Sequence, residues 1–322
     1  MELTEPRGGT DPSTDPIDEL LRGVRTDEVR VRRTELTPPW TLRLPEAGPA
    51  DDAALTLCAP LRGEGWLAPA AGGGAAARRV RVNDTVIVRG SALATPQVRL
   101  TDRPPAGGPG EPAPAARTVL LLGAYRVRGE VSRRLLDLLP PVLVVPGEED
   151  CSSLLDFLDG QFAGGAAPGQ QVVVDRLLDW LLVCTLRDWF DRPEAGSPGW
   201  FRALGDAAVG PALRALHAAP QRPWTLAALA REAGVSRTTL ASRFSRLVGE
   251  PPLAYLTHWR MALAADLLTE STATVAAVAR QVGYADAFGF STAFKRARGM
   301  SPTAYRDCAA RADCRPAAPA PA

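Results

Sequence analysis

The stretch TLAALAREAGVSRTTLASRFSRLVGEPPLAY begins at Thr225, and TVAAVARQVGYADAFGFSTAFKRARGMSPTAY begins at Thr274. Apart from one inserted residue the two stretches are in register, with threonine, alanine, arginine, glycine, phenylalanine, proline and tyrosine recurring at corresponding positions. A repeat of this length indicates a single supersecondary unit that the chain uses twice. The structure of that unit decides the fold of residues 225–305.

Each copy shows the pattern of two helices joined by a tight turn. After Thr225, which is placed to cap a helix, apolar residues recur every three or four positions, and Gly234 stands where a left-handed residue ends a helix. Ser236 can then cap a second helix, which Gly249 and the following prolines stop. Two helices with a glycine-containing turn form a helix-turn-helix. We predict such motifs at 225–248 and 274–297, with one long helix between them.

Basic charge is concentrated in this part of the chain. Residues 220–307 contain 11 arginines and lysines against 6 acidic residues, whereas residues 1–219 contain 24 basic and 29 acidic residues. A nearly neutral chain of 322 residues with one basic end suggests two domains, of which one meets phosphate. The alternative for the helical pattern is an ordinary helical bundle that binds nothing.

Several phrases in the repeats are typical of one regulator family: A-x-x-x-G-V-S-R-x-x-L-x-x-R-F at Ala230–Phe244, and G-Y, F-S-x-A-F-K-R and G-M-S-P-x-x-Y-R between Gly283 and Arg306. With them the chain resembles the DNA-binding domain of AraC/XylS-type transcriptional regulators. The resemblance implies an all-α domain in which the second helix of each motif enters the major groove of double-stranded DNA. Two such helices would read segments about 34 Å apart on one face of the duplex.

Carried over to this sequence, the resemblance places the reading helices at Arg237–Val248 and Ala287–Ala297. Arginine can form a bidentate pair with guanine, while hydroxyl groups and backbone amides mostly hold phosphates. The predicted DNA-binding residues of the first motif are Ser236, Arg237, Thr238, Thr239, Ala241, Ser242, Arg243, Ser245 and Arg246. Those of the second motif are Asp286, Ala287, Phe288, Ser291, Thr292, Lys295 and Arg296.

The sequence departs from the family pattern at two of these positions. Ser242 stands where an arginine often precedes the R-F pair, and Thr292 stands where F-S-R-A-F is common. Two side chains that read guanine well are therefore missing. We expect base readout that is weaker than in such relatives, or that is directed to other bases.

The N-terminal half has the pattern of a small β-barrel. Short stretches with strand character are separated by proline, glycine and Asn-Asp breakers, which is typical of a sandwich or barrel. Residues 103–117 are low in complexity and are predicted to form a loop. The predicted strands are Val29–Leu36, Trp40–Leu44, Ala54–Ala59, Gly65–Ala68, Val80–Val82, Thr85–Val88 and Thr118–Tyr125, after a short helix at Ile17–Arg25.

Phrases of this half are similar to the cupin-type effector domain of one AraC subgroup: P-W-T-L-R at Pro39–Arg43, R-G-E-x-W-L at Arg62–Leu67 and D-L-L-P-P at Asp137–Pro141. The resemblance implies an α+β multidomain chain with a cupin-like β-barrel, a helical hairpin and an all-α double helix-turn-helix domain. The expected parts are a disordered N-terminus (1–16), an effector and dimerisation domain (17–192), a linker (193–199), the DNA-binding domain (200–307) and a disordered tail (308–322).

An effector would fill the barrel, and the candidate pocket residues are Trp40, Trp66 and Tyr125, although aromatic residues in such places are common in cores. Cupin enzymes usually hold a metal ion through several histidines, but this chain has only His217 and His258, both in predicted helices outside the barrel. A G-x-S-x-G elbow and a phosphate loop are missing as well. We therefore expect no metal site, no cofactor and no catalytic residues.

The five cysteines are widely spaced and form no C-x-x-C pair, which argues against zinc and against a disulfide framework. Whether Cys58, Cys151 or Cys184 senses oxidants is left open. Two helices are predicted after the barrel, at Cys151–Phe162 and Val172–Phe190. The second is apolar around most of its circumference, so it either packs within the chain on more than one side or also forms a dimer interface. The resemblance favours a homodimer.

Together these observations predict a sequence-specific transcriptional regulator that is not an enzyme. No apolar run reaches the roughly 20 residues that span a bilayer, and a signal-peptide pattern is missing, so we expect a cytoplasmic protein. Its partners would be operator DNA, a second copy of the chain, an unidentified small-molecule effector and RNA polymerase. The alternatives are a metal-free cupin-type enzyme fused to a helical domain and an architectural DNA binder without an effector. The sequence does not name the effector, the operator or the direction of regulation.

Overall fold

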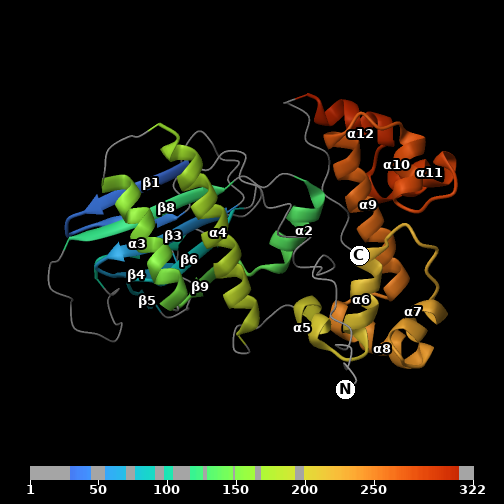
Figure 1. The fold of residues 1–322 in the computed structure, drawn as a ribbon, viewed down its shortest axis with the longest axis horizontal. Coiled ribbons are helices and arrows are strands. Elements are labelled where there is room, and N and C mark those ends of the chain that lie inside the picture. The colour runs from blue at the N-terminus through green and yellow to red at the C-terminus, as the bar shows by residue number, and fades with distance from the viewer. Residues whose placement is uncertain are drawn as a thin grey trace, which may run out of the picture. The chain divides into compact units, whose positions relative to one another are not determined.

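The computed structural model describes residues 30–44, 55–69, 77–90, 98–103, 117–125, 129–147, 149–163, 168–192 and 199–311. The predicted N-terminal segment, the predicted helix at 17–25, the segment 193–198, residues 312–322 of the tail and most of the low-complexity loop lie outside them. The chain divides into two compact units (Figure 1). Among the described residues, the helical unit comprises 129–134 and 199–311, and the sheet unit comprises the others.

The sheet unit contains two antiparallel sheets, one of five strands in the order β1-β8-β3-β6-β9 and one of four strands in the order β2-β7-β4-β5. Adjacent strands pair antiparallel throughout. The strands are β1 (Arg30–Leu36), β2 (Thr41–Leu44), β3 (Leu55–Arg62), β4 (Gly65–Pro69), β5 (Arg78–Val80), β6 (Thr85–Arg89), β7 (Val98–Thr101), β8 (Thr118–Tyr125) and β9 (Val142–Val145).

An apolar core fills the space between these strands. Leu44, Val80 and Leu120 are fully buried in it, together with Cys58. Two helices, α3 (Glu149–Ala163) and α4 (Gln170–Asp191), lie across one face of the five-stranded sheet (Figure 1). The inner strands β3 and β8 are therefore covered on both faces, which explains why their sequences are almost continuous apolar runs.

Each of the seven predicted strands is present within about three residues of its expected bounds, and both predicted helices of this unit are present. Three further elements, β7, β9 and the short helix α2 (Glu130–Leu138), are not among those predicted from the sequence. All three are short, and β9 directly follows a proline pair. Their structure depends on pairing or packing partners that are distant in the sequence, such as the β6–β9 ladder.

The helical unit contains both predicted helix-turn-helix motifs, and its helices begin at the expected caps. Thr225, Ser236 and Thr274 each accept a hydrogen bond from a backbone N–H of the following helix. Two helices precede the first motif and are separated at Asp206, which caps the second of them by accepting from the N–H groups of Ala208 and Val209. The helices are α5 (Gly199–Gly205), α6 (Val209–Ala218), α7 (Leu226–Glu232), α8 (Arg237–Val248), α9 (Pro252–Glu270), α10 (Val275–Gln281), α11 (Ala287–Arg298) and α12 (Pro302–Ala309).

Helix α9 joins the two motifs, with α8 at one end and α10 to α12 at the other (Figure 1). Near its start, His217 is buried against Trp259, and its Nε2 lies 2.7 Å from the hydroxyl oxygen of Tyr255. His217 therefore packs and hydrogen-bonds within the helical unit. The second histidine, His258, has its Nδ1 atom 2.6 Å from a carboxylate oxygen of Glu250. No helix of the described residues is long and apolar enough to cross a membrane.

Candidate nucleic-acid interface

The turn of each helix-turn-helix is made by a glycine with a left-handed backbone. Gly234 has φ +67° and Gly283 has φ +85°, a conformation that side chains with a Cβ atom rarely adopt. Gly283 is also closely packed, because a Cβ atom there would lie 2.6 Å from the carbonyl oxygen of Gln221. The turn orients the second helix of each motif, α8 or α11, so that one side packs on the unit and the other faces solvent.

Helix α8 is held by Leu240 and Phe244, which are fully buried. Its exposed side carries the predicted residues Arg237, Thr238, Ser242 and Arg246, together with the cap Ser236, while Thr239, Ala241 and Ser245 are half-buried. The structure thus presents most of the predicted residues of the first motif on one solvent-facing side.

Arg243 is placed differently from the other predicted residues of α8. Its Nη2 atom lies 2.8 Å from the carboxylate of Asp206, which precedes α6. Burial alone would raise the pKa of Asp206, but the N–H groups of Val209 and Ala208 and the Arg243 guanidinium together hold it below its usual range. Arg243 therefore connects α8 to the rest of the unit. The sequence pattern predicts it as a DNA-binding residue because a local pattern contains no information about a partner 37 positions away.

Helix α11 is anchored by Phe290 and Phe294, both fully buried. Its exposed side carries the predicted residues Asp286, Phe288, Thr292, Lys295 and Arg296, while Ala287 and Ser291 are half-buried. One carboxylate oxygen of Asp286 accepts hydrogen bonds from the N–H groups of Phe288 (2.9 Å) and Gly289 (2.7 Å). Asp286 is therefore the helix cap, a role that its charge favours at a helix N-terminus.

The cations of the two reading helices fall into two groups. Arg237, Arg246, Lys295 and Arg296 are exposed, and none of them has a carboxylate partner among the described residues. Arg298, in contrast, is buried, and its Nη1 atom lies 2.7 Å from a carboxylate oxygen of Glu130. The unpaired cations are the ones that can meet phosphate.

The start of α2 supports the second motif through contacts that the sequence does not predict. The carboxylate of Asp266, on α9, accepts hydrogen bonds from the N–H groups of Glu130 (2.5 Å) and Val131 (3.1 Å) and so caps α2. Burial is the main cause that raises the pKa of Asp266 to about 6. Residues 129–134 belong to the helical unit. The carboxylate of Glu130 also forms an ion pair with Arg298 there. No local signal in the sequence points to these contacts between positions more than 130 residues apart.

The three predicted pocket residues of the sheet unit are not brought together. Trp40 is buried in the core between the sheets, whereas Trp66 lies on the opposite face of β4 from the core residue Leu67. Tyr125 lies on the helix-facing side of β8, where its hydroxyl group donates a hydrogen bond to the carbonyl oxygen of Leu178 (3.1 Å), and burial raises its pKa. Strand alternation separates these side chains, so Trp40 alone is left as a candidate inside the barrel.

Among the described residues, no group of three or more histidine, cysteine or acidic side chains could hold a metal ion. Cys58 is buried in the core and Cys184 is half-buried on α4. The cysteine spacing argued against a disulfide framework, and the structure differs from that expectation at Cys308, which is disulfide-bonded.

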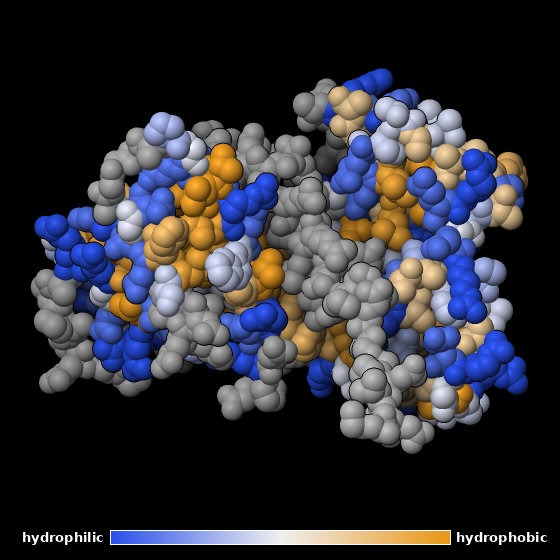
Figure 2. All heavy atoms as spheres, viewed as in Figure 1, coloured by the Kyte–Doolittle hydropathy of each residue, from blue (hydrophilic) through white to orange (hydrophobic). Residues whose placement is uncertain are grey.

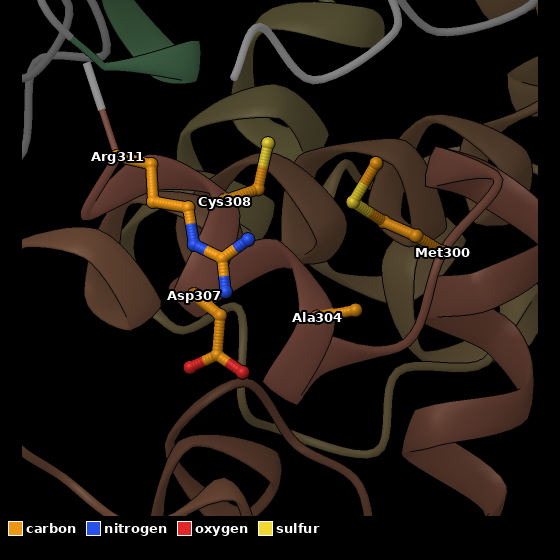
Figure 3. Close-up of a pocket in the computed structure, with 5 residues that line it drawn as sticks. All are labelled: Met300, Ala304, Asp307, Cys308 and Arg311. Carbon is orange, nitrogen blue, oxygen red and sulfur yellow. The ribbon is translucent and has the colours of Figure 1, made fainter. Parts of the chain in front are cut away.

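A shallow pocket of about 350 Å³ opens beside α12 (Figure 3). Its lining residues are Met300, Ala304, Asp307, Cys308 and Arg311. None of them lies on the exposed sides of α8 or α11, although Met300 belongs to the G-M-S-P phrase of the second motif.

The fold and the two solvent-facing helices define a double helix-turn-helix protein with a separate β-sheet unit. Residues 15–191 match the family model described as Cupin, and residues 229–307 match the one described as helix-turn-helix domain. A putative AraC-like transcription regulator of Streptomyces lividans is 39% identical over 191 residues, which are 58% of this chain and 62% of that protein.

The regulator AlkR of Acinetobacter baylyi is 38% identical over 142 residues, which are 43% of this chain and 45% of AlkR. A solved DNA-binding transcriptional dual regulator of Escherichia coli K-12 is 26% identical, with a TM-score of 0.30, over 33% of this chain and 93% of that one. The chain belongs to the AraC-type transcription regulators that carry a cupin domain. The matched region spans less than two thirds of the length of these curated relatives.

Proposed function

We propose that this chain is a DNA-binding transcription regulator whose helical unit reads one face of a duplex with α8 and α11. The observation that carries the proposal is the separation of the cations on these helices. Arg243 and Arg298 are neutralised by carboxylates of the unit, while the exposed cations of both helices have no such partner among the described residues. Cations placed in this way neutralise phosphates, and the exposed side chains between them can reach base edges.

Fluorescence anisotropy of the full chain on the DNA upstream of its own gene and its neighbours tests this proposal. We expect one fragment to bind at least roughly a thousandfold more tightly than random duplex. Lys295→Ala should lower the slope of log affinity against log salt by about one, since it removes one phosphate contact. Arg187→Ala, an exposed change in the sheet unit, is the matched control and should leave the slope unchanged. Equal, steeply salt-dependent binding to every fragment would instead identify an architectural DNA binder.

We further propose that the sheet unit senses a small molecule inside its barrel. The Nε1–H group of Trp40 is buried and has no hydrogen-bond partner among the described residues. A buried donor without a partner costs about 1–3 kcal/mol, so such groups are rare unless something else binds them. The core around Trp40 consists of apolar side chains. This combination favours an effector that is mostly apolar and has one hydrogen-bond acceptor.

Trp40→Phe tests the sensing role because it keeps an aromatic ring and removes only the N–H group and part of the ring system. We expect some compounds in a panel of medium-chain acids, ketones and ethers to raise the melting temperature of the wild-type chain and to change its affinity for the selected DNA. Trp40→Phe should lose that response, and Trp180→Phe, at a residue 59% exposed on α4, should keep it. An equal response of both variants would place the ligand elsewhere. A ligand can shift DNA binding only through its different affinity for two states of the chain.

The third part of the proposal is a homodimer formed through α4. Leu178, Leu181, Leu182 and Leu186 of α4 are buried within the chain. A second apolar side stays exposed, as the apolar spheres over α4 in Figure 2 show. It includes Val172, Val173 and Trp180 of α4 and Phe157 of the neighbouring α3, which are between 44% and 63% exposed.

Exposed apolar patches of this kind mark interaction sites. Sedimentation equilibrium of the wild-type chain should show a dimer, and Trp180→Glu should shift it to monomer without a loss of secondary structure. An unchanged oligomeric state in Trp180→Glu would exclude this interface. A regulator of this kind would act through RNA polymerase, and transcription from the selected promoter in a purified system would show whether it activates or represses.

A further inference from the structure

Phe288 is the most exposed large apolar side chain of the described residues, with 84% of its surface in contact with solvent. It lies in the first turn of α11, on the same side as Thr292, Lys295 and Arg296. A single exposed apolar residue needs no explanation by itself. The groups around it, however, restrict what this end of the helix can bind.

The first turn of α11 is poorly suited to phosphate. The N–H groups of Phe288 and Gly289 are already bonded to Asp286, and the carboxylate places a negative charge where a phosphate would have to lie. The hydroxyl group of Thr292, one turn further on, donates to the carbonyl oxygen of Phe288 (3.0 Å), so its hydrogen is also used within the helix. The two unpaired cations, Lys295 and Arg296, lie at the other end of α11.

The outward surface of this turn is thus apolar, and it lies on the same side of α11 as the cations that would bind the DNA backbone. In the major groove, the C5 methyl group of thymine is the apolar feature that distinguishes one base from the others, and phenylalanine is among the side chains that contact it. We propose that Phe288 determines specificity by packing on the C5 methyl group of a thymine in the groove segment that α11 enters. This inference rests on the proposed DNA-binding function.

The first motif provides an internal comparison. Its corresponding residue is Thr238, and its corresponding cap is the uncharged Ser236, whose hydroxyl accepts from the N–H group of Thr239. The first turn of α8 therefore lacks both the ring and the negative charge. A thymine contact of this kind is expected on the segment read by α11 and not on the segment read by α8.

The experiment begins with selection of a tight-binding duplex from a random library, with the full-length wild-type chain as bait. Each thymine of that duplex is then replaced by deoxyuracil, which removes only the C5 methyl group. Affinities are measured by fluorescence anisotropy for the wild type, Phe288→Ala, Phe288→Leu and the control Val82→Ala, which changes an exposed apolar side chain of the sheet unit outside the proposed dimer surface. Melting temperatures show that each variant is folded, which is expected because both side chains are exposed.

At one or two neighbouring positions, uracil should weaken binding of the wild type about fourfold, the value for loss of one buried methyl-sized group. Phe288→Ala should be insensitive to uracil at those positions, Phe288→Leu should keep part of the effect, and Val82→Ala should behave as the wild type. Equal sensitivity of the wild type and Phe288→Ala at every position would overturn the inference while leaving DNA binding intact. Unchanged affinity of Phe288→Ala for the unmodified duplex would also overturn the inference, because the ring would then make no contact with the DNA. Failure of the selection to enrich any sequence would contradict the proposed function itself.

Discussion

The two helix-turn-helix motifs share a scaffold and differ in their outward sides. In both, a threonine caps the first helix, a left-handed glycine makes the turn and a fully buried phenylalanine, Phe244 or Phe294, anchors the second helix. The outward positions Ser236 and Thr238 of the first motif correspond to Asp286 and Phe288 of the second. Backbone geometry and packing restrict the scaffold positions, whereas the outward positions are free to differ, so the difference between the motifs lies where a ligand would bind.

The inner supports of the motifs differ as well. The half-buried Arg243 of α8 pairs with Asp206, and the buried Arg298 of α11 pairs with Glu130. The first pair connects α8 to the residue that caps α6, whereas the second connects α11 to the start of α2.

The shared scaffold should make Phe244→Ala and Phe294→Ala equally damaging. Both side chains are fully buried, and removal of a buried phenylalanine ring costs about 3–5 kcal/mol through lost burial and the cavity that remains. Urea unfolding of the full chain, followed by circular dichroism, measures the two free energies. If one substitution costs less than half as much as the other, the two motifs do not share an equivalent scaffold.

The inner ion pairs should differ in their contribution to stability. Glu130→Gln leaves the buried Arg298 without a counter-charge, and we expect a loss of about 3 kcal/mol in the free energy of unfolding. Asp206→Asn removes the charge opposite Arg243, whose side chain is 42% exposed, and should cost about 1 kcal/mol or less. The same denaturation experiment compares them, and a larger loss for Asp206→Asn would reverse this ranking.

Asp266, the carboxylate that supports the second motif, should also titrate at a higher pH than Asp206, the carboxylate that supports the first. The pKa of Asp266 is raised to about 6 from 3.8, chiefly by burial, so the folded chain holds this proton more tightly than the unfolded chain does. Protonation of Asp266 therefore contributes at most about 3 kcal/mol to the free energy of unfolding. This contribution is fully present below about pH 4 and is lost as the pH rises through about 6.

Asp266→Asn keeps an oxygen that can cap α2 and removes the titration. The free energy of unfolding of this variant should therefore vary less between pH 4 and 7 than that of the wild type. The pKa of Asp206 is lowered, so Asp206 contributes stability that is lost only as the pH falls below its unfolded value. Parallel pH profiles of the wild type and Asp266→Asn would show that Asp266 does not titrate in this range.

The two turn glycines should respond differently to alanine. Gly234→Ala introduces a side chain into a left-handed conformation with no atom within 4 Å, and should cost about 1–2 kcal/mol. Gly283→Ala adds to the same strain a Cβ atom 2.6 Å from a backbone oxygen, so its cost should be the larger of the two. Thermal unfolding followed by circular dichroism ranks the variants, and equal melting temperatures would show that the backbone around Gly283 yields to the new side chain.

The helices of the motifs could be predicted to within a residue or two because their start and stop signals are local. The caps Thr225, Ser236 and Thr274 and the glycines that follow each helix act within one turn of the chain. The missed elements β7, β9 and α2 are short, and the contacts that stabilise them come from distant parts of the sequence.

The outward residues of α8 and α11 could be predicted for a similar reason, because a helical period places them on one side. The partners of Arg243 and Arg298 could not, because an ion pair between residues 37 or 168 positions apart leaves no local pattern. The candidate pocket residues were chosen by residue type alone. In the structure Trp40, which directly precedes β2, lies in the core, whereas alternation along β8 places Tyr125 on the helix-facing side.

The central claim is that α8 and α11 bind two segments of the same face of DNA through different side chains. Hydroxyl-radical footprinting of the full chain on its selected duplex tests it most directly. Each copy of the chain should protect two segments about 10 base pairs apart. Arg237→Ala combined with Arg246→Ala should remove one protected segment, and Lys295→Ala combined with Arg296→Ala should remove the other. A single protected segment, or loss of both segments in each variant, would contradict the account.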